Sequence, residues 1–244
     1  MEFKSNKQAL IDKLRSNYEA SRKKLLNESV EFLIANSEDN AAECQVFNTL
    51  LEYPFSTDDV NYLLQFNHPL SVVSDEAWRQ SHGIFEDDLY ETITSAYSLE
   101  PDGRTEKPGD ETALREKLQE NMHFLSAEWQ ALSPEALIDR AEQIYIPRLI
   151  FEAFQDYKAD ADEARAMMES ERPLDVLSEE WRRRNPGVFA KVVKNVMENV
   201  VGNPDNYNDY ELDELYAGRG EGGAFAGASI ETAAPKQDEQ EEKR

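Results

Sequence analysis

An internal repeat is the feature of this sequence that most constrains its fold. Shifting the 244-residue chain by 104 positions aligns identical residues without a gap, from Leu14 with Leu118 to Glu76 with Glu180. The matches include apolar, aromatic and turn residues in one order, which indicates a tandem duplication. We therefore predict one repeat over residues 5–97 and a second over 113–201. The other identical pairs include Asn17/Asn121, Glu31/Glu135, Leu33/Leu137, Ile34/Ile138, Phe47/Phe151, Tyr53/Tyr157, Asp58/Asp162, Pro69/Pro173, Leu70/Leu174 and Ser74/Ser178.

The segments outside the two copies differ from them in composition. Residues 98–112 hold two Pro, two Gly and few apolar side chains, and are predicted to form a flexible linker. Residues 202–244 carry 11 acids and 4 bases and few large aliphatic side chains. Such a segment buries too little apolar surface to offset its ordering entropy, so we predict a disordered acidic tail. Within the tail, residues 207–216 (YNDYELDELY) are either a solvated stretch or a short helical binding segment.

Apolar residues spaced by three, four and seven positions predict helices throughout both copies. Ser29 and Ser133 are suitable N-caps for the second helix of each copy. In copy one this helix is expected to run as one helix over 29–53. In copy two Pro147 is expected to kink or split it. No convincing alternating strand pattern is present. The predicted fold is all-α, with two tandem repeats of about five helices each. The later helices are expected to begin after Ser56, at Pro69 and Pro173, and near Gly83 and Pro186.

The second copy resembles a small helical domain family of unknown function from bacterial mobile elements. The resemblance rests on four stretches and a closing helix near Val200: Ser133-Pro134-Glu135, residues 141–154 (AEQIYIPRLIFEAF), residues 164–168 (ARAMM) and residues 173–181 (PLDVLSEEW). It covers about 85 residues per copy, and copy one diverges between its second helix and Pro69. The resemblance implies a helical fold and a mobile-element setting. It implies no reaction and no site residue.

No catalytic, cofactor-binding or metal-ligating pattern emerges. His68, His82 and His123 have no histidine or cysteine partner at helical spacing, and Cys44 has no visible His-Asp partner set. The glycines of 218–227 follow no strand and lack a Gly-Lys-Ser/Thr ending. The acids of 160–163 lack the spacing of an EF-hand loop and are better interpreted as a helix start. We therefore predict a protein that is not an enzyme and needs no cofactor or metal.

Three consecutive arginines, Arg182 to Arg184, stand out against the acidic background. Basic residues at the C-terminus of a helix complement its dipole, and Pro186 soon afterwards ends the helix. The alternative is that the arginines dock on an acidic surface, which could be this protein's own.

The charge balance excludes several classes of partner. With 50 acids and 26 bases the net charge is −24, which should repel nucleic-acid phosphates and anionic membranes. The single Cys excludes a disulfide framework, and no apolar run approaches a membrane span. The N-terminus lacks the apolar stretch of a secretory signal. These features predict a soluble cytoplasmic protein.

The acids are distributed unequally between the copies. The stretch from Leu25 to Trp78 contains ten acids and no base, whereas copy two has five bases in the equivalent region. This stretch is either an ordinary solvated face or a field for a basic partner. On a single helix over 29–53, Glu31 and Glu38 would share one face and lie about 10 Å apart. Charges at this spacing are too sparse to imitate duplex DNA. Imitation of DNA would therefore require acids from several helices. The candidate partner-binding residues are Glu31, Glu38, Glu52, Asp58, Asp59, Asp75, Glu76, Glu86, Asp87, Asp88 and Glu91.

Two functions are compatible with these observations. The first is a non-enzymatic acidic protein that binds a basic nucleic-acid-handling protein such as a nuclease. In a mobile-element setting it would act as an anti-restriction or anti-CRISPR inhibitor that imitates DNA. The second is a structural or adaptor module that docks partners through its acidic tail. An enzyme with an unrecognised site is a third possibility, which alanine substitution of the histidines and Cys44 would test. The sequence leaves the oligomeric state undetermined.

Overall fold

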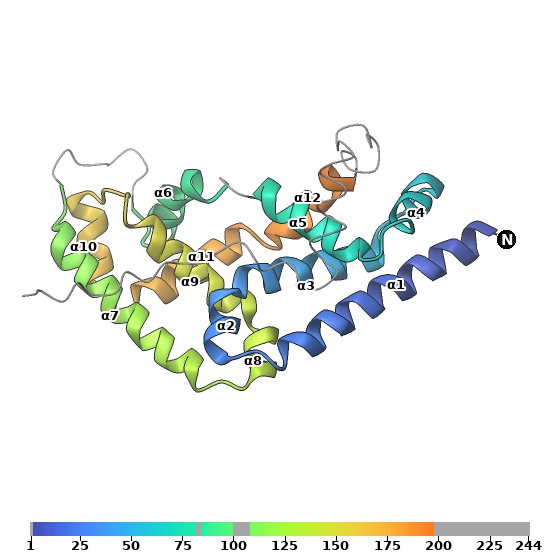
Figure 1. Ribbon diagram of the computed structural model, residues 1–244. Helices are drawn as coiled ribbons and strands as arrows, with labels where there is room; N and C mark the ends of the chain where they lie inside the picture. The colour runs from blue at the N-terminus through green and yellow to red at the C-terminus, as the bar shows by residue number, and fades with distance from the viewer. Residues whose placement is uncertain (1, 82–83, 100–107, 198–244) are drawn as a thin grey trace, which may run out of the picture.

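The computed structural model describes residues 2–81, 84–99 and 108–197, and within them the chain is all-helical, as the sequence predicts (Figure 1). Twelve α-helices span this described part, and no strand occurs in it. The first six are α1 Glu2–Leu25, α2 Val30–Ala35, α3 Ser37–Glu52, α4 Thr57–Leu63, α5 Pro69–Ser81 and α6 Ile84–Ala96. The second six are α7 Glu111–Gln130, α8 Pro134–Asp139, α9 Ala141–Ala153, α10 Ala161–Glu169, α11 Pro173–Arg184 and α12 Val188–Val196.

Corresponding helices of the two halves begin at equal spacing. The starts of α2 to α6 and of α8 to α12 differ by 104 residues in every case. Their caps also correspond: the Ser29 hydroxyl accepts from the Phe32 amide at 3.1 Å, and the Ser133 hydroxyl accepts from the Ala136 amide at 3.3 Å. Each fourth helix opens with a reciprocal capping box, formed by Ser56 with Asp59 in α4 and by a buried Asp–Glu pair in α10. The acids of 160–163 therefore start a helix, as predicted.

Each half has six helices rather than the five expected, because the segment predicted as one helix over 29–53 is broken. The break falls at Asn36 and, in the second half, at Arg140, both with φ near −105° and ψ near 20°. The Asn36 side chain donates to the Phe32 carbonyl at 2.8 Å, which satisfies the end of α2 locally. Pro147 does not split its helix and lies inside α9. The carbonyl that loses its helical donor to Pro147 belongs to Gln143, which is exposed to solvent.

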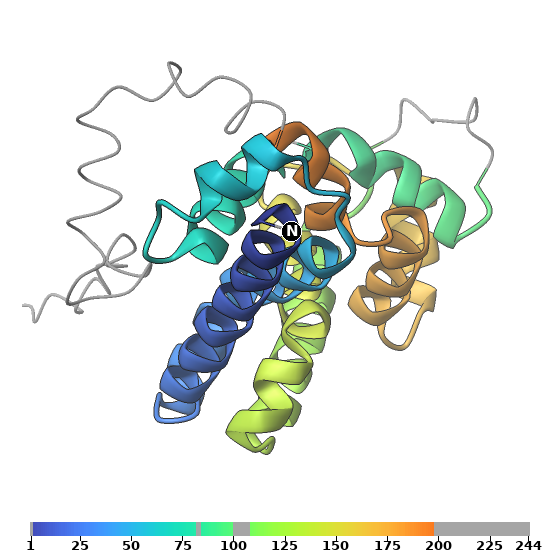
Figure 2. The ribbon, with the colours of Figure 1, turned by 90° about the vertical axis from the view of Figure 1, so that its right-hand side faces the viewer.

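The two halves exchange their last helices. Helix α6 leaves its own half and packs on α11 and α9, while α12 packs on α5 and α3 of the first half. Helices α3 and α9 pack on each other at the centre, as do α2 and α8. The long helices α1 and α7 lie on the outside and approach each other near α2 and α8 (Figures 1 and 2). The halves are therefore interlocked around a shared centre.

One hydrophobic core runs through both halves. The predicted apolar positions Leu14, Leu33, Val46 and Leu50 are buried, as are their counterparts in the second half. The Tyr145 and Phe189 rings contact each other at 5.9 Å between centroids, joining α9 to α12. Part of the predicted linker is also packed, because the Gly109 amide donates to the Ala159 carbonyl at 3.1 Å. Residues 100–107 of that linker and the predicted acidic tail lie outside the described residues.

Candidate functional site

The acids predicted to bind a partner are spread over five helices. Glu31 lies in the first turn of α2, Glu38 in the first turn of α3, and Glu52 at the end of α3. Because the chain breaks at Asn36, Glu31 does not share one helix with the other two, and the expected common face over 29–53 does not form. Glu31 and Glu52 are exposed, whereas Glu38 is half-buried.

The two acids at the start of α4 have different roles. The Asp59 carboxylate accepts a hydrogen bond from the Ser56 amide at 2.6 Å, while the Ser56 hydroxyl accepts from the Asp59 amide at 3.1 Å. Asp59 therefore serves the helix start. Asp58 in the same turn is exposed and complements the helix dipole from the outside.

The remaining candidates lie on α5 and α6. Asp75 and Glu76 are half-buried, and Glu76 accepts a hydrogen bond from the Gln80 side chain at 2.8 Å. Glu91 forms an ion pair with Arg184 of α11. Glu91 and Glu76 are thus already engaged within the chain. Glu86, Asp87 and Asp88 belong to α6, but their side chains are outside the described residues.

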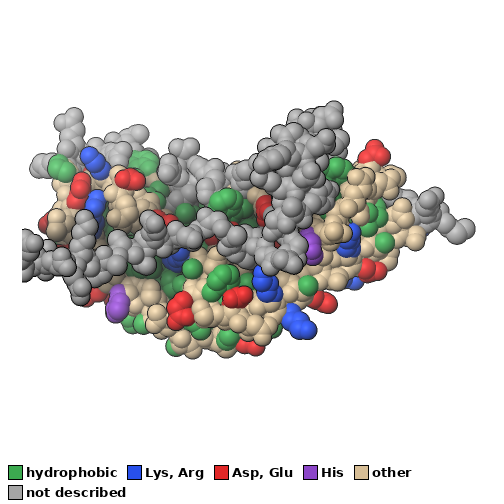
Figure 3. Space-filling model, in the orientation of Figure 1, with side chains coloured by type: hydrophobic (Ala, Val, Ile, Leu, Met, Phe, Trp, Pro, Cys, Tyr) green, Lys and Arg blue, Asp and Glu red, His purple; other side chains and the backbone are tan. Residues whose placement is uncertain are grey.

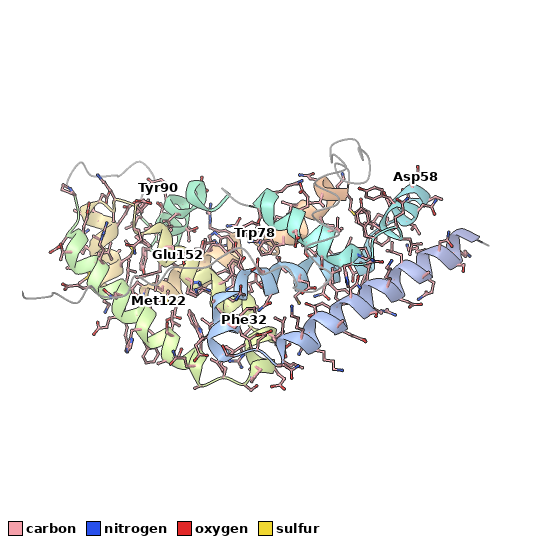
Figure 4. All side chains as sticks on the ribbon, in the orientation of Figure 1. Phe32, Asp58, Trp78, Tyr90, Met122 and Glu152 are labelled. Carbon is pink, nitrogen blue, oxygen red and sulfur yellow. The ribbon has the colours of Figure 1, made fainter. Side chains whose placement is uncertain are left out.

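The structure does not gather those of these acids whose side chains it describes into one dense patch. Helices α2 and α4 lie at opposite ends of α3, which at 16 residues is about 24 Å long. Figure 4 shows this separation through Phe32 of α2 and Asp58 of α4. On the face drawn in Figure 3, acidic side chains are scattered among other types. Of the candidates with described side chains, Glu31, Glu52 and Asp58 are exposed and form no ion pair within the described part of the chain.

A basic helix lies against this acidic region, a contact that the sequence patterns do not predict. Helix α1 carries seven Lys or Arg and three Asp or Glu, and it packs on α3, α4 and α5. Lys13 donates to the Leu64 carbonyl at the end of α4 at 3.2 Å, and Arg22 pairs with Asp139 of α8 at 2.7 Å. The signal was available, because the bases end at Lys24, just before the base-free stretch begins.

Both interpretations of the three arginines hold. Arg182, Arg183 and Arg184 form the last turn of α11, where they complement the helix dipole. Arg184 also docks on an acid of another helix, Glu91 of α6, whereas Arg182 pairs with Glu179 of α11 itself. Arg183 pairs with Glu180 at 2.6 Å, and its hydrogen bond, together with one from the Ser95 hydroxyl, lowers the pKa of Glu180 to about 2.

The residues considered for catalysis that the structure describes lie on different parts of the fold. Cys44 is half-buried and accepts a weak hydrogen bond from Asn48 at 3.6 Å. Burial, reinforced by Cys44, raises the pKa of the neighbouring Tyr18, whose ring stacks on Phe47 at 4.2 Å. His68 is exposed just before α5, and His123 is exposed on α7. His82 is outside the described residues. Within the part of the chain that the structure describes, no group of His, Cys, Asp or Glu is arranged to hold a metal ion.

The sequence patterns also do not predict the exposed aromatic side chain of Phe124 on α7. Phe124 of α7 is half exposed, and the Arg172 guanidinium lies 4.4 Å from its ring centroid. Arg172 is held there by Glu128 at 3.0 Å and Asp175 at 2.5 Å. The position of Arg172 is occupied by His68 in the first half.

Comparison with protein-family models, with curated proteins and with solved structures found no match to this chain. Among the described helices, none is long and apolar enough to cross a membrane.

Proposed function

We propose that this chain is a non-enzymatic protein that binds a basic nucleic-acid-handling protein through the acidic surface of its first half. The observation that carries the proposal is the stretch from Leu25 to Trp78, which has ten acids and no base. Its exposed members Glu31, Glu52 and Asp58 lie on α2, α3 and α4, none of which contains Lys or Arg. Charges of one sign at the rim of an interface steer a partner of the opposite sign and set its salt dependence.

The spacing of these acids limits how closely the surface can imitate DNA. The exposed acids flank α3 over about 24 Å, whereas duplex DNA carries one charge per about 1.7 Å. The surface therefore supplies a few separated charges, and a basic partner such as a nuclease would meet them at discrete points. In a mobile-element setting, such a protein would act as an anti-restriction or anti-CRISPR inhibitor in the cytoplasm.

The finer architecture is part of the same proposal. We interpret the equal spacing of helix starts and the matched caps as two copies of one six-helix unit. The copies share a scaffold and differ in charge, because the second has bases throughout the equivalent region. Duplication would let one copy retain the scaffold role while the other acquired the partner-binding surface.

The test compares equivalent acids of the two halves in the full chain. One variant combines Glu31→Gln, Glu52→Gln and Asp58→Asn. The control combines Glu135→Gln, Asp156→Asn and Asp162→Asn, which are the acids 104 positions further on. Each is used to capture proteins from lysate at low and high salt, with identification by mass spectrometry. The first variant should lose a basic nucleic-acid-binding protein that the control retains at low salt. Equal capture by both variants would contradict the proposal.

An adaptor function is the second candidate, and one finding favours it. Asp59, Glu76 and Glu91 are engaged within the chain, which reduces the acids available on the folded surface. The acidic tail would then be the docking element on an interlocked helical body. Deleting residues 203–244 should abolish capture in this case, while the first-half variant above should capture normally.

A further inference from the structure

An acidic ridge with one aromatic residue runs along the exposed side of α7. Glu116, Glu120, Phe124 and Glu128 are spaced by four residues, so successive members lie about one turn apart on the helix. All four side chains are exposed. This α7 ridge is about 18 Å long at about 1.5 Å per residue. Met122 marks the same part of the helix in Figure 4, and α7 lies on the outside of the fold in Figure 1.

The aromatic ring of the ridge is exposed but held in place. Phe124 is the most exposed large apolar side chain among the described residues, at 50%. One side of its ring is fixed by the Arg172 guanidinium, which is itself held by Glu128 and Asp175. The Nε of Arg172 and the Oδ2 of Asp175 are buried. An exposed ring that is already fixed loses little conformational entropy on binding, as is typical of an interface anchor.

The repeat provides an internal comparison for these residues. Helix α1 packs on α3, α4 and α5 as α7 packs on α9, α10 and α11. The first-half residues at the positions of Phe124, Glu128, Arg172 and Asp175 are Ala20, Lys24, His68 and Ser71. None of the four is the same, although the helices pack on equivalent neighbours. The fold therefore does not require an exposed ring or its ion pairs at this place.

The charge around the ring selects the chemistry of a partner. The exposed side chains of α7 include four glutamates and a single Lys or Arg, Arg115, which donates to the Gln155 carbonyl at 3.0 Å. Glu116 and Glu120 form no ion pair within the described part of the chain. A negative rim attracts a basic segment and disfavours an acidic one. An apolar anchor in a line of acids complements an amphipathic helix whose apolar face is flanked by Lys or Arg.

We propose that the α7 ridge docks a basic amphipathic helix of a partner protein. Phe124 packs against the apolar face of that helix, while Glu116 and Glu120 pair with its Lys or Arg side chains. The class of partner is that of the proposed function, but the surface lies on the other half and uses none of the acids named there. The two halves then offer a basic partner two separate contacts.

Binding of a defined peptide to the full-length chain tests the proposal. The probe is a synthetic helical peptide with Leu on one face and Lys on its flanks. Phe124→Ala, which installs the residue of the first half, should weaken binding about tenfold or more. The matched control combines Phe124→Ala with Ala20→Phe, which keeps the composition and net charge of the wild type. It should bind as weakly as Phe124→Ala alone. Equal affinity of the wild type and Phe124→Ala, or no binding by the wild type at low salt, would overturn the proposal.

Neutralising the acids of the ridge is a separate measurement with the same peptide. Glu116→Gln combined with Glu120→Gln leaves the contact between Phe124 and Arg172 in place. It should weaken binding several-fold at low salt, and the difference should shrink at high salt. The control combines Glu19→Gln and Glu135→Gln, which neutralise exposed acids of other helices and should leave binding unchanged. Equal weakening by the two pairs would show that net charge alone attracts the peptide, which contradicts docking on the ridge.

The first-half variant separates this proposal from the proposed function. With Glu31, Glu52 and Asp58 neutralised, the chain should bind the peptide like the wild type, whatever proteins it captures from lysate. The first-half acids can therefore fail their own test while the ridge passes, and the reverse. Loss of peptide binding in the first-half variant, with normal binding by Phe124→Ala, would place the peptide on the first half and refute docking on α7.

Discussion

The Arg148 guanidinium of α9 donates to the Ile34 carbonyl oxygen at 2.5 Å, across the seam between the two halves. The same nitrogen lies 3.0 Å from the Ala35 carbonyl and 3.3 Å from the Ser37 hydroxyl. Arg148 therefore places a positive charge on the last carbonyls of α2, where the helix dipole is negative. In the first half, Cys44 occupies the aligned position, so only one of the two equivalent helix ends has this cap.

Replacing Arg148 should destabilise the fold. Arg148→Met keeps most of the aliphatic stem but removes the donors to α2, and we expect a loss of about 1–2 kcal/mol in the free energy of unfolding. Arg165→Met is the control, because Arg165 is two-thirds exposed and, among the described residues, pairs with Asp162 of its own helix. It should cost less than about 0.5 kcal/mol. Urea unfolding followed by circular dichroism measures both, and equal midpoints for the two variants would show that the cap contributes nothing.

Two glycines should respond differently to alanine. Gly109 packs so tightly that an added Cβ would lie 2.5 Å from the Ala164 Cβ and 2.7 Å from the Asp160 carbonyl oxygen. Gly109→Ala must therefore displace backbone and should cost about 1–3 kcal/mol. Gly187 has a φ of 63° but its nearest contact would be 3.3 Å away, so Gly187→Ala should cost about 1 kcal/mol from backbone strain alone. Thermal unfolding should rank Gly109→Ala as the less stable, and the reverse order would contradict this account of the linker.

Acid should destabilise the folded chain through Glu180 of α11. Its pKa falls from an ordinary 4.5 to about 2 in the folded chain, chiefly because Arg183 donates to the carboxylate. A depressed folded pKa means that the stabilisation is complete above pH 4.5 and is lost as the pH falls toward 2. The stability difference between wild type and Glu180→Gln should therefore shrink between pH 4.5 and 2. Glu179→Gln, which changes a largely exposed neighbour, should give a nearly constant difference.

Local signals in the sequence predict much of the fold. The caps at Ser29, Ser133 and Ser56 begin helices as expected, because a side-chain oxygen bonds an amide only three residues away. The break at Asn36 was not predicted, because neither Pro nor Gly marks the end of the helix there. The residue that caps this helix end, Arg148, lies 112 residues further along the chain.

The candidate site was less predictable than the fold. Base-free stretches are visible in the sequence, but which acids remain available depends on partners that are distant along the chain. Glu91 is engaged by Arg184, which is 93 residues away, because α6 docks on the opposite half. Apolar periodicity shows that a helix has a buried face, but it does not identify the helix on which that face packs.

The buried hydroxyl of Thr92 provides the last prediction. Thr92 is completely buried and its hydroxyl has no partner, while the aligned residue in α12 is Val196, which is also completely buried. Thr92→Val removes an unsatisfied polar group and keeps the shape, so it should stabilise the chain by about 1 kcal/mol. Val196→Thr should destabilise it by a similar amount. Thr94→Val is the control, because the Thr94 hydroxyl donates to the Tyr90 carbonyl at 2.8 Å and its removal brings no gain.

Since Thr92 lies in the seam of α6, Thr92→Val should also slow hydrogen exchange of the α6 amides. Stabilisation without slower exchange in α6 would show that the penalty does not act on the docking of this helix.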